Sequence, residues 1–224
     1  MKTKFTLALL AMAALCQAQQ TEMRDLGNFK KINASKGVNI SLTQGKQTEM
    51  EVNVDGCALE DVAAEIKKET LFVKMKRRPQ GAAVQVIVTY VDIDEISVSS
   101  GASVETQDPI ERESLTVSAG ANTETNLEVY VKRLDVSINS ALVSISGEAE
   151  SQTVEATAVV SNAKYDGAAL ASKHAKAKAG LNAQIEIKAS ETIEAEADGG
   201  TVAYRTENAK VTTSKSNGGQ ITTF

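Results

Sequence analysis

The 224-residue sequence is poor in the residues that build most enzyme active sites and disulfide frameworks. It has one histidine, two cysteines, two prolines and no tryptophan, and aromatic residues make up only 4% of the chain. A single histidine excludes zinc sites that need several imidazole ligands. Two cysteines exclude the multiple disulfides that hold small secreted domains together. A stable fold must therefore come from an apolar core, and 42% of the residues are hydrophobic.

The first 18 residues have the three-part organisation of a secretory signal peptide. Lys2 and Lys4 precede an apolar run from Phe5 to Leu15, and Cys16-x-Ala18 follows. We expect cleavage after Ala18 and export of the chain to the periplasm, the outer-membrane surface or the medium. The apolar run is shorter than the roughly 20 residues that cross a bilayer. The bulky Leu15 argues against a lipid on Cys16.

Cleavage would leave an acidic chain with one cysteine. Removing two lysines changes 24 basic and 29 acidic residues into 22 and 29, a net charge of −7. This balance argues against nucleic acid as a partner, and no second membrane segment follows. We expect the remaining Cys57 to be a small buried apolar residue, with a reactive thiol as the less favoured alternative. Residues 19–224 are enough for one continuous domain.

Short apolar runs recur through residues 96–224 at intervals of 18 to 21. Small or turn-forming residues follow each run, and Gly and Asn accept the left-handed backbone of a corner. Val159 stands at one such position and departs from the pattern. The first apolar residues of the runs are Ile96, Leu115, Leu134, Val154, Ala175, Ile193 and Val211, and the expected structural corners are Gly101, Gly120, Asn139, Gly180, Gly199 and Gly218.

Within each run the apolar residues alternate with polar ones, which is typical of β-strands. A repeat of about 19 residues suits three short strands and three corners, stacked on the next coil at about 4.8 Å. The sequence therefore predicts an all-β protein with a right-handed parallel β-helix over 96–224, a solenoid of seven coils about 34 Å long. A β-sandwich with evenly spaced hairpins is the alternative. The corners recur in phase, which favours the solenoid.

Residues 19–95 read differently. Longer alternating strands are expected at 38–42, 50–54, 71–75 and 84–90. Residues 57–68 fit either helical spacing or one helical turn followed by a strand. We expect this region to cap the first end of the rod, because an open end of a β-helix invites aggregation. The last residues, SNGGQITTF, look like a final short coil.

The segment FKKINASKGVNISLTQGKQTEMEVNVDG, the strand ETLFVKMKRR and the corners SSGAS, SAGAN and SNGG carry a resemblance. Together they resemble the putative auto-transporter adhesin family, also called the head GIN domain, over roughly residues 26–224. The resemblance implies a β-helical secreted or envelope protein of Gram-negative bacteria with an adhesive role. It implies no catalytic residues. The alanine-rich coils at 154–183 have fewer large apolar residues than the family pattern.

No group of residues predicts catalysis or a cofactor. Asp92 and Asp94, which Glu95 follows, could hold calcium, but no loop of spaced Asp, Asn and Gly supports this. Alternating acids such as Glu194 and Glu196 usually form a solvated outer face. The single His174 lies among lysines, where a catalytic triad cannot be argued. The sequence thus predicts no enzyme, no cofactor and no metal site.

Two surfaces are candidate contacts for a partner. Tyr130, Tyr165 and Tyr204 could form a loose ladder along the rod, although half-buried positions are the favoured alternative. Lys74, Lys76, Arg77 and Arg78 could meet an acidic glycan or a lipid headgroup.

Three functional hypotheses follow from these patterns. The first is an adhesin-like module that binds a glycan or a host or envelope protein through polar faces. The second is a structural envelope protein that self-associates, which a homo-oligomer would fit. A carbohydrate-active β-helix enzyme is a distant third.

Overall fold

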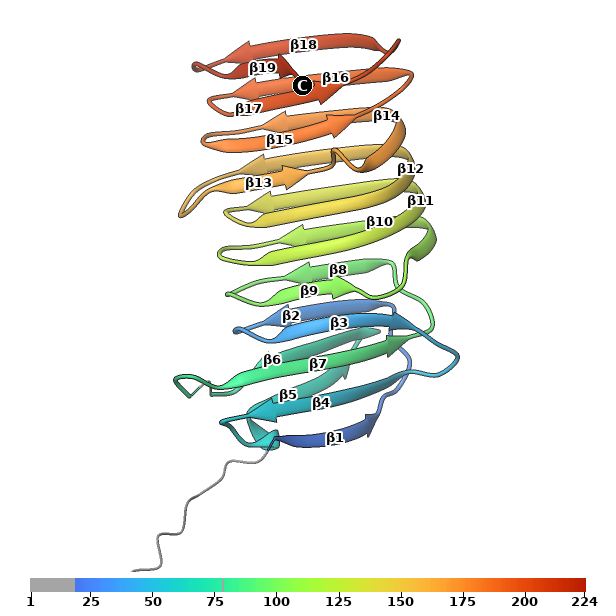
Figure 1. Ribbon diagram of the computed structural model, residues 1–224, viewed down its shortest axis with the longest axis vertical. Helices are drawn as coiled ribbons and strands as arrows, with labels where there is room; N and C mark the ends of the chain where they lie inside the picture. The colour runs from blue at the N-terminus through green and yellow to red at the C-terminus, as the bar shows by residue number, and fades with distance from the viewer. Residues whose placement is uncertain (1–18, 78) are drawn as a thin grey trace, which may run out of the picture.

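A computed structural model describes residues 19–77 and 79–224, so the expected signal peptide at 1–18 and Arg78 lie outside the described residues. The described chain is nearly all β-strand and winds into a β-solenoid of about seven turns (Figure 1). The predicted parallel β-helix is confirmed. Its strands are β8 (Glu95–Val98), β9 (Ser103–Thr106), β10 (Ile110–Ala119), β11 (Glu124–Asn139), β12 (Leu142–Thr157), β13 (Ala163–Asp166), β14 (Leu170–Ala179), β15 (Ala183–Lys188), β16 (Thr192–Asp198), β17 (Thr201–Arg205), β18 (Lys210–Ser216) and β19 (Gln220–Thr223).

Each coil differs from the expected three short strands. In the last coils two strands suffice, such as β15 and β16, because the strands lie on two faces joined at two sides. In the middle of the rod β11 and β12 run continuously from one face, around one side, onto the other face. One side of the rod is therefore made of tight corners, and on the opposite side β11 and β12 form a smooth strand bend in the middle of the rod.

The register corrects the sequence alignment in two places. Val117 is the partner of Ile96, where the sequence alignment paired Ile96 with Leu115. Val154 stacks between Val136 and Ala177. Side chains alternate with period two, so a shift of two residues keeps every apolar side chain in the core. Matching the first apolar residue of each run could not detect that shift.

In the N-terminal region the order of the strands along the rod differs from their order in the sequence. Its elements are β1 (Gln20–Asp25), β2 (Lys31–Ser35), β3 (Asn39–Gln44), β4 (Glu49–Asp55), the 3-10 turn η1 (Leu59–Asp61), β5 (Val62–Lys67), β6 (Thr70–Met75) and β7 (Ala83–Tyr90). Strand β2 pairs in parallel with both β6 and β8, and β3 with both β7 and β9. The coil β2–β3 comes first in the sequence but lies between the coil of β6 and β7 and the coil of β8 and β9. After β3 the chain forms the strands at the N-terminal end of the rod, and it then passes β2–β3 to begin the coil β8–β9. The open alternative at 57–68 resolves as one helical turn followed by a strand.

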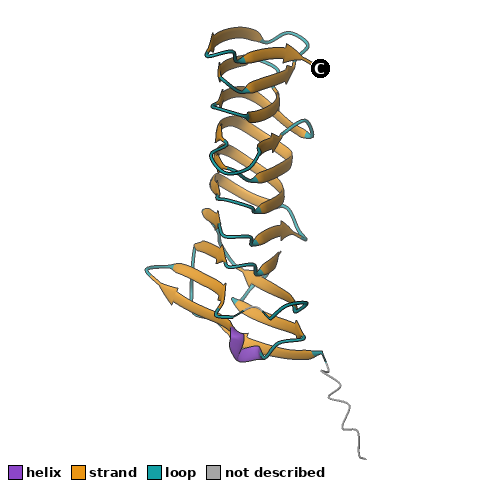
Figure 2. Cartoon of the chain, turned by 90° about the vertical axis from the view of Figure 1, so that its left-hand side faces the viewer, coloured by secondary structure: helices purple, strands orange, loops and turns teal. Residues whose placement is uncertain are grey.

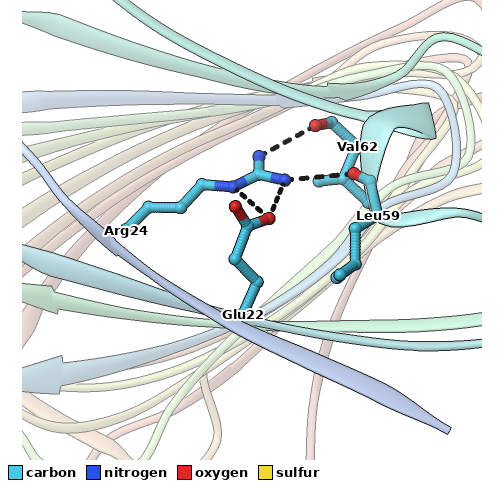
Figure 3. Close-up of polar contacts among 4 residues, drawn as sticks. All are labelled: Glu22, Arg24, Leu59 and Val62. Carbon is cyan, nitrogen blue, oxygen red and sulfur yellow. Dashed lines mark hydrogen bonds and ion pairs between the residues drawn. The ribbon is translucent and has the colours of Figure 1, made fainter.

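Antiparallel strands finish this end of the rod. Strand β4 lies between β1 and β7, and β5 pairs with β6, all antiparallel (Figure 1). Figure 2 shows the short helical turn η1, in purple, at the same end of the rod. Arg24 on β1 donates hydrogen bonds to the carbonyl oxygens of Leu59 and Val62, at 3.0 and 2.9 Å. Glu22 holds the same guanidinium at 2.6 Å (Figure 3). This contact ties β1 to η1 and β5, so the two edge strands are joined across the end of the core.

The core runs the length of the rod and changes in composition along it. Large aliphatic side chains such as Ile32, Leu42 and Leu71 fill the N-terminal coils. The coils from 154 to 183 bury mostly alanine, and here Tyr165 is fully buried. A phenol ring fills space that alanines leave, and its hydroxyl donates to Gln152 at 3.1 Å. Burial raises the pKa of Tyr165. Cys57, expected to be buried, is partly buried against the core.

Most tight corners use a left-handed residue, though half of the expected positions shift. Gly101, Gly199 and Gly218 have positive φ as expected. Beside Gly120, Asn139 and Gly180, the left-handed residues are Asn122, Ser140 and Asn182. Asparagine adopts this conformation more readily than most other non-glycine residues. Position 180 requires glycine for a steric reason, because a Cβ there would lie 2.7 Å from the Thr157 hydroxyl oxygen.

Candidate functional site: a groove along the side of the rod

The strand bend carries a ladder of alternating charge. At each level one residue of the bend drops out of the strand register, and these residues are Glu113, Lys132, Glu150, Lys173 and, in the last coil of the series, Glu191. Lys132 contacts Glu113 at 2.5 Å, and Lys173 contacts Glu150 at 3.8 Å. The hydrogen bond lowers the pKa of Glu113 and raises that of Lys132. Opposite signs on successive coils are compatible with the close stacking of the bend, and exposed pairs of this kind contribute little to stability.

Two hollows lie against this bend, with volumes of about 560 and 480 Å³. Both are lined by Ala171, Ser172 and Ser190, so they adjoin each other, and together they are called the side groove below. The side groove runs from Arg112 and Tyr130 to Arg205 and Asn208. It crosses five coil steps, about 24 Å at the usual strand spacing.

Small residues make the floor. The inward column at the bend changes from Val131 to Ala149 and then to Ser172. Exposed Ala171 and Ser190 add little bulk beside them. The depth of the side groove therefore comes from side-chain size, since the backbone spacing of a solenoid is nearly constant along the rod.

A buried polar network supports this floor. Gln152 is buried. Its side-chain oxygen accepts a hydrogen bond from the Tyr165 hydroxyl, and its side-chain nitrogen donates one to the Ser172 hydroxyl at 2.9 Å. The Ser172 hydroxyl donates to the carbonyl of Lys188 at 2.6 Å, and Gln152 donates to the same carbonyl at 3.2 Å. Buried polar groups that are all paired hold neighbouring backbone in one geometry. The network fixes the wall at Lys188.

The three tyrosines predicted to form a ladder do not share one face of the rod. Tyr130 lines the side groove and is 41% exposed. Tyr165 is 0% exposed, and Tyr204 packs partly buried against the core. Tyr130 points outward from its strand, while the other two occupy inward positions. Of the three, only Tyr130 can offer a ring face to a ligand.

The predicted basic cluster lies far from the groove in sequence and in the fold. Lys74, Lys76 and Arg77 are exposed near the end of β6, and Arg78 lies outside the described residues. Arg77 lies 3.5 Å from the Asp61 carboxylate. This cluster stays a candidate contact on the N-terminal end.

The acids that could have carried chemistry are held in separate ion pairs. Asp92 and Asp94 lie in the connection after β7 and bind the guanidinium of Arg112, Asp94 at 2.7 Å. Glu194 and Glu196 pair with Lys176 and Lys178 on the preceding coil. The two groups do not converge in one groove.

His174 is likewise held by its neighbours on the bend. Its Nδ1 is 3.0 Å from the Thr192 hydroxyl, and its Nε2 is 3.7 Å from the Glu191 carboxylate. Within the described residues no cluster of three metal-binding side chains is found.

Sequence reasoning missed the side groove because alanine and serine carry no motif. One signal was present. Glu113, Lys132, Glu150, Lys173 and Glu191 alternate in sign at roughly the coil interval, which marks a stacked column of exposed residues. Finding that column would have located the bend but not the hollow beside it.

On the opposite side, the corner at 158–162 replaces a tight turn with a longer loop. Val159 and Val160 are 72% and 75% exposed, and Leu142 and Leu181 are exposed on the corners below and above. The buried Ser140 hydroxyl accepts both valine amides at 2.9 Å. The two valines, Leu142 and Leu181 are called the apolar corner below.

Comparison with known proteins gives the family. The model of the family described as putative auto-transporter adhesin, head GIN domain, matches residues 28–208. The chain belongs to this family. The match ends before β18, so the last coil lies beyond the part of the head GIN domain that the family model covers. The predicted resemblance is confirmed, and it supports an adhesin-like role.

Solved structures share the fold of this head GIN domain chain. A putative adhesin from Bacteroides fragilis has a TM-score of 0.78 at 16% identity, covering 93% of this chain and 98% of that one. A putative adhesin from Parabacteroides merdae has a TM-score of 0.71 at 18% identity, covering 92% and 96%. A putative lipid binding protein from Parabacteroides distasonis has 0.69 at 13%, covering 92% and 96%. No curated protein matches the sequence.

Proposed function

We propose that this chain is an exported, non-enzymatic adhesin-like module that binds an extended glycan in its side groove. The observation that carries the proposal is the side groove itself, a polar channel along the rod with an exposed tyrosine at one end. A ligand lying along several coils makes many weak contacts, which suits adhesion by avidity. Family membership supports the adhesive role.

Export is supported by the pattern of residues 1–18 and by the family. Among the described residues, no helix is long and apolar enough to cross a bilayer.

Two acids of the side groove bear on the enzyme alternative. Glu148 and Glu150 are both exposed, and Glu150 is held near Lys173. A glycoside hydrolase needs a carboxyl whose pKa is raised by burial, to act as general acid. The exposure of both Glu148 and Glu150 to solvent supports binding without catalysis.

The test is a glycan and matrix-protein array probed with residues 19–224 and with Ala171→Trp. Ala171 is exposed on the floor, so tryptophan fills the side groove without disturbing the core. Ala203→Trp is the matched control, because Ala203 lies outside the groove lining on an outer face of β17. We expect a glycan hit that Ala171→Trp abolishes and Ala203→Trp retains. Equal binding by all three proteins would place the ligand elsewhere.

The apolar corner favours a second function, self-association as a structural envelope component. Ser140 holds Val159 and Val160 out in solvent, and exposed apolar patches mark contact sites. Val159→Asp with Val160→Asp should then lower the sedimentation coefficient of concentrated protein, and the exposed Val91→Asp should not. A wild-type protein that stays monomeric at every concentration would remove this candidate.

A further inference from the structure

On one wall of the side groove, two cationic side chains lie directly opposite each other on neighbouring strands. Lys188 on β15 and Arg205 on β17 are register partners, and both are exposed and line the same hollow. Like charges directly opposite each other on neighbouring strands are destabilising. Elsewhere on this rod, lysines opposite a charged residue face an acid, as Lys176 faces Glu194 and Lys178 faces Glu196.

Neither cation has a carboxylate side chain to balance it. Lys188 and Arg205 take part in no ion pair with an acidic side chain among residues 19–77 and 79–224. Arg205 donates from Nε to the main-chain oxygen of Phe224 at 3.3 Å, and its guanidinium lies 4.7 Å from the Phe224 ring centre. That contact orients the guanidinium but uses only one of its nitrogens, so the two terminal nitrogens keep their donors for another acceptor.

The backbone that carries this pair is fixed from inside. The carbonyl of Lys188 accepts hydrogen bonds from both Ser172 and Gln152. The amide of Ala189 donates to the carbonyl of Arg205 at 3.3 Å, which joins the two cationic positions. The Lys188 and Arg205 positions are thus held side by side before any ligand arrives, and a prearranged site binds at a lower ordering cost.

The lining also limits the charge density of the ligand. Glu207 lies in the same hollow as the pair, and Glu148 and Glu150 lie further along the groove. A polymer with dense charge, such as nucleic acid, would meet these acids. A glycan with spaced carboxylates can place one at the cation pair and neutral hydroxyls elsewhere.

We propose that Lys188 and Arg205 form a subsite for a carboxylate of a uronate-bearing glycan that lies along the side groove. Arginine binds carboxylates through two parallel hydrogen bonds, and lysine adds a second charge. Thr206 and Asn208 line the same hollow. The proposal rests on the proposed function, since it assigns the ligand class of the same groove.

The test is a calorimetric titration of residues 19–224 with oligogalacturonate, with its methyl ester and with a sulfated oligosaccharide of matched length. We expect oligogalacturonate to bind, and the neutral ester to bind about tenfold more weakly. Lys188→Gln with Arg205→Gln should weaken oligogalacturonate by a similar factor. Lys30→Gln with Lys46→Gln, two exposed lysines outside the groove, changes the net charge equally and should have no effect.

The outcomes separate this proposal from the proposed function. Equal affinity for the acid and its ester would overturn the carboxylate subsite while groove binding, reported by Ala171→Trp, stands. Preference for the sulfated ligand would overturn the assignment to uronate. No binding of wild type to any of the three would overturn the subsite, and the array would still decide whether the groove binds another glycan.

Discussion

At the N-terminal end of the rod, antiparallel strands β1, β4 and β5 lie over the core and Arg24 ties β1 to β5, whereas the last described coil, β18–β19, is a parallel coil like those before it. Among the described strands β18 pairs only with β16, and β19 only with β17. The core beneath each end differs too. Large aliphatic residues lie under the N-terminal strands, and alanines lie under β18.

The last described coil differs from the coils before it in its inward residues. The inward column that is Ala195 and Ala197 in β16 becomes Thr213 and Lys215 in β18. A lysine at an inward position of an edge strand opposes pairing with another chain. Strands therefore cover the core at the N-terminal end, and the last described coil has a polar inward column instead. Both devices address the free strand edge that every open solenoid has.

The largest expected difference is in packing. Leu71→Ala, at a fully buried N-terminal position, should lower the free energy of unfolding by about 2–5 kcal/mol, the usual cost of a buried leucine truncation. Ile221→Ala in the last coil, where the side chain is only half-buried, should cost about 1 kcal/mol. Urea denaturation followed by circular dichroism measures both. Similar losses at the two positions would mean that the ends are equally packed.

The second largest effect is expected where Arg24 joins β1 to η1 and β5 at the N-terminal end. Arg24→Ala removes hydrogen bonds from a charged donor to two carbonyls, and should destabilise β1 by about 1–3 kcal/mol. Hydrogen exchange of the β1 and β4 amides should speed up, while β16 is unchanged. Lys46→Ala, an exposed cation nearby in the chain, is the control. If β1 exchanges at its wild-type rate without Arg24, strand pairing with β4 holds it alone.

A smaller effect on stability, but a visible one on association, is expected at the other end. Lys215→Val with Thr213→Val makes the last inward column apolar, which leaves unfolding within about 0.5 kcal/mol but invites pairing of the open edge. Sedimentation velocity should show concentration-dependent growth in size. Thr212→Val changes an outward neighbour on the same strand and should remain monomeric. Unchanged sedimentation of the double variant would show that the polar column is not the protecting feature.

The smallest effect is an acid-sensitive contact in the last corner. Asp198 accepts hydrogen bonds from Ser216 and Asn217 at 2.7 and 2.5 Å, and these lower the pKa of Asp198 below 3.8. A carboxyl with a depressed pKa in the fold stabilises above its unfolded pKa, and that stability disappears as the pH falls through the folded value. The difference in stability between wild type and Asp198→Asn should therefore shrink below pH 3.8. A difference that persists at lower pH would contradict this assignment.

The sequence predicted where the strands of this fold lie better than it predicted which strands pair with each other. Alternating Val, Ile and Leu with turn residues at fixed intervals predicts parallel coils, because both patterns are local. The position of β2 between β6 and β8 is set by contacts such as Ile32 with Leu71 and Ile96, far apart in the chain. No local pattern specifies which of several similar apolar strands will pair.

The candidate site was predicted only in part, for a similar reason. Tyr130 was singled out from its spacing and does line the side groove, but the same spacing selected Tyr165, which is buried among alanines. Whether a tyrosine points in or out depends on a register shift of one residue. Lys188 and Arg205 are 17 positions apart in the sequence and become neighbours only when β15 and β17 stack.

The side groove is the central claim, and differential hydrogen exchange with and without oligogalacturonate tests it most directly. The predicted result is slower exchange confined to the groove segments around Ser172, Ser190 and Asn208, with the ends of the rod unchanged. Protection at the apolar corner or along the basic residues near Lys74, with none in the groove, would contradict it.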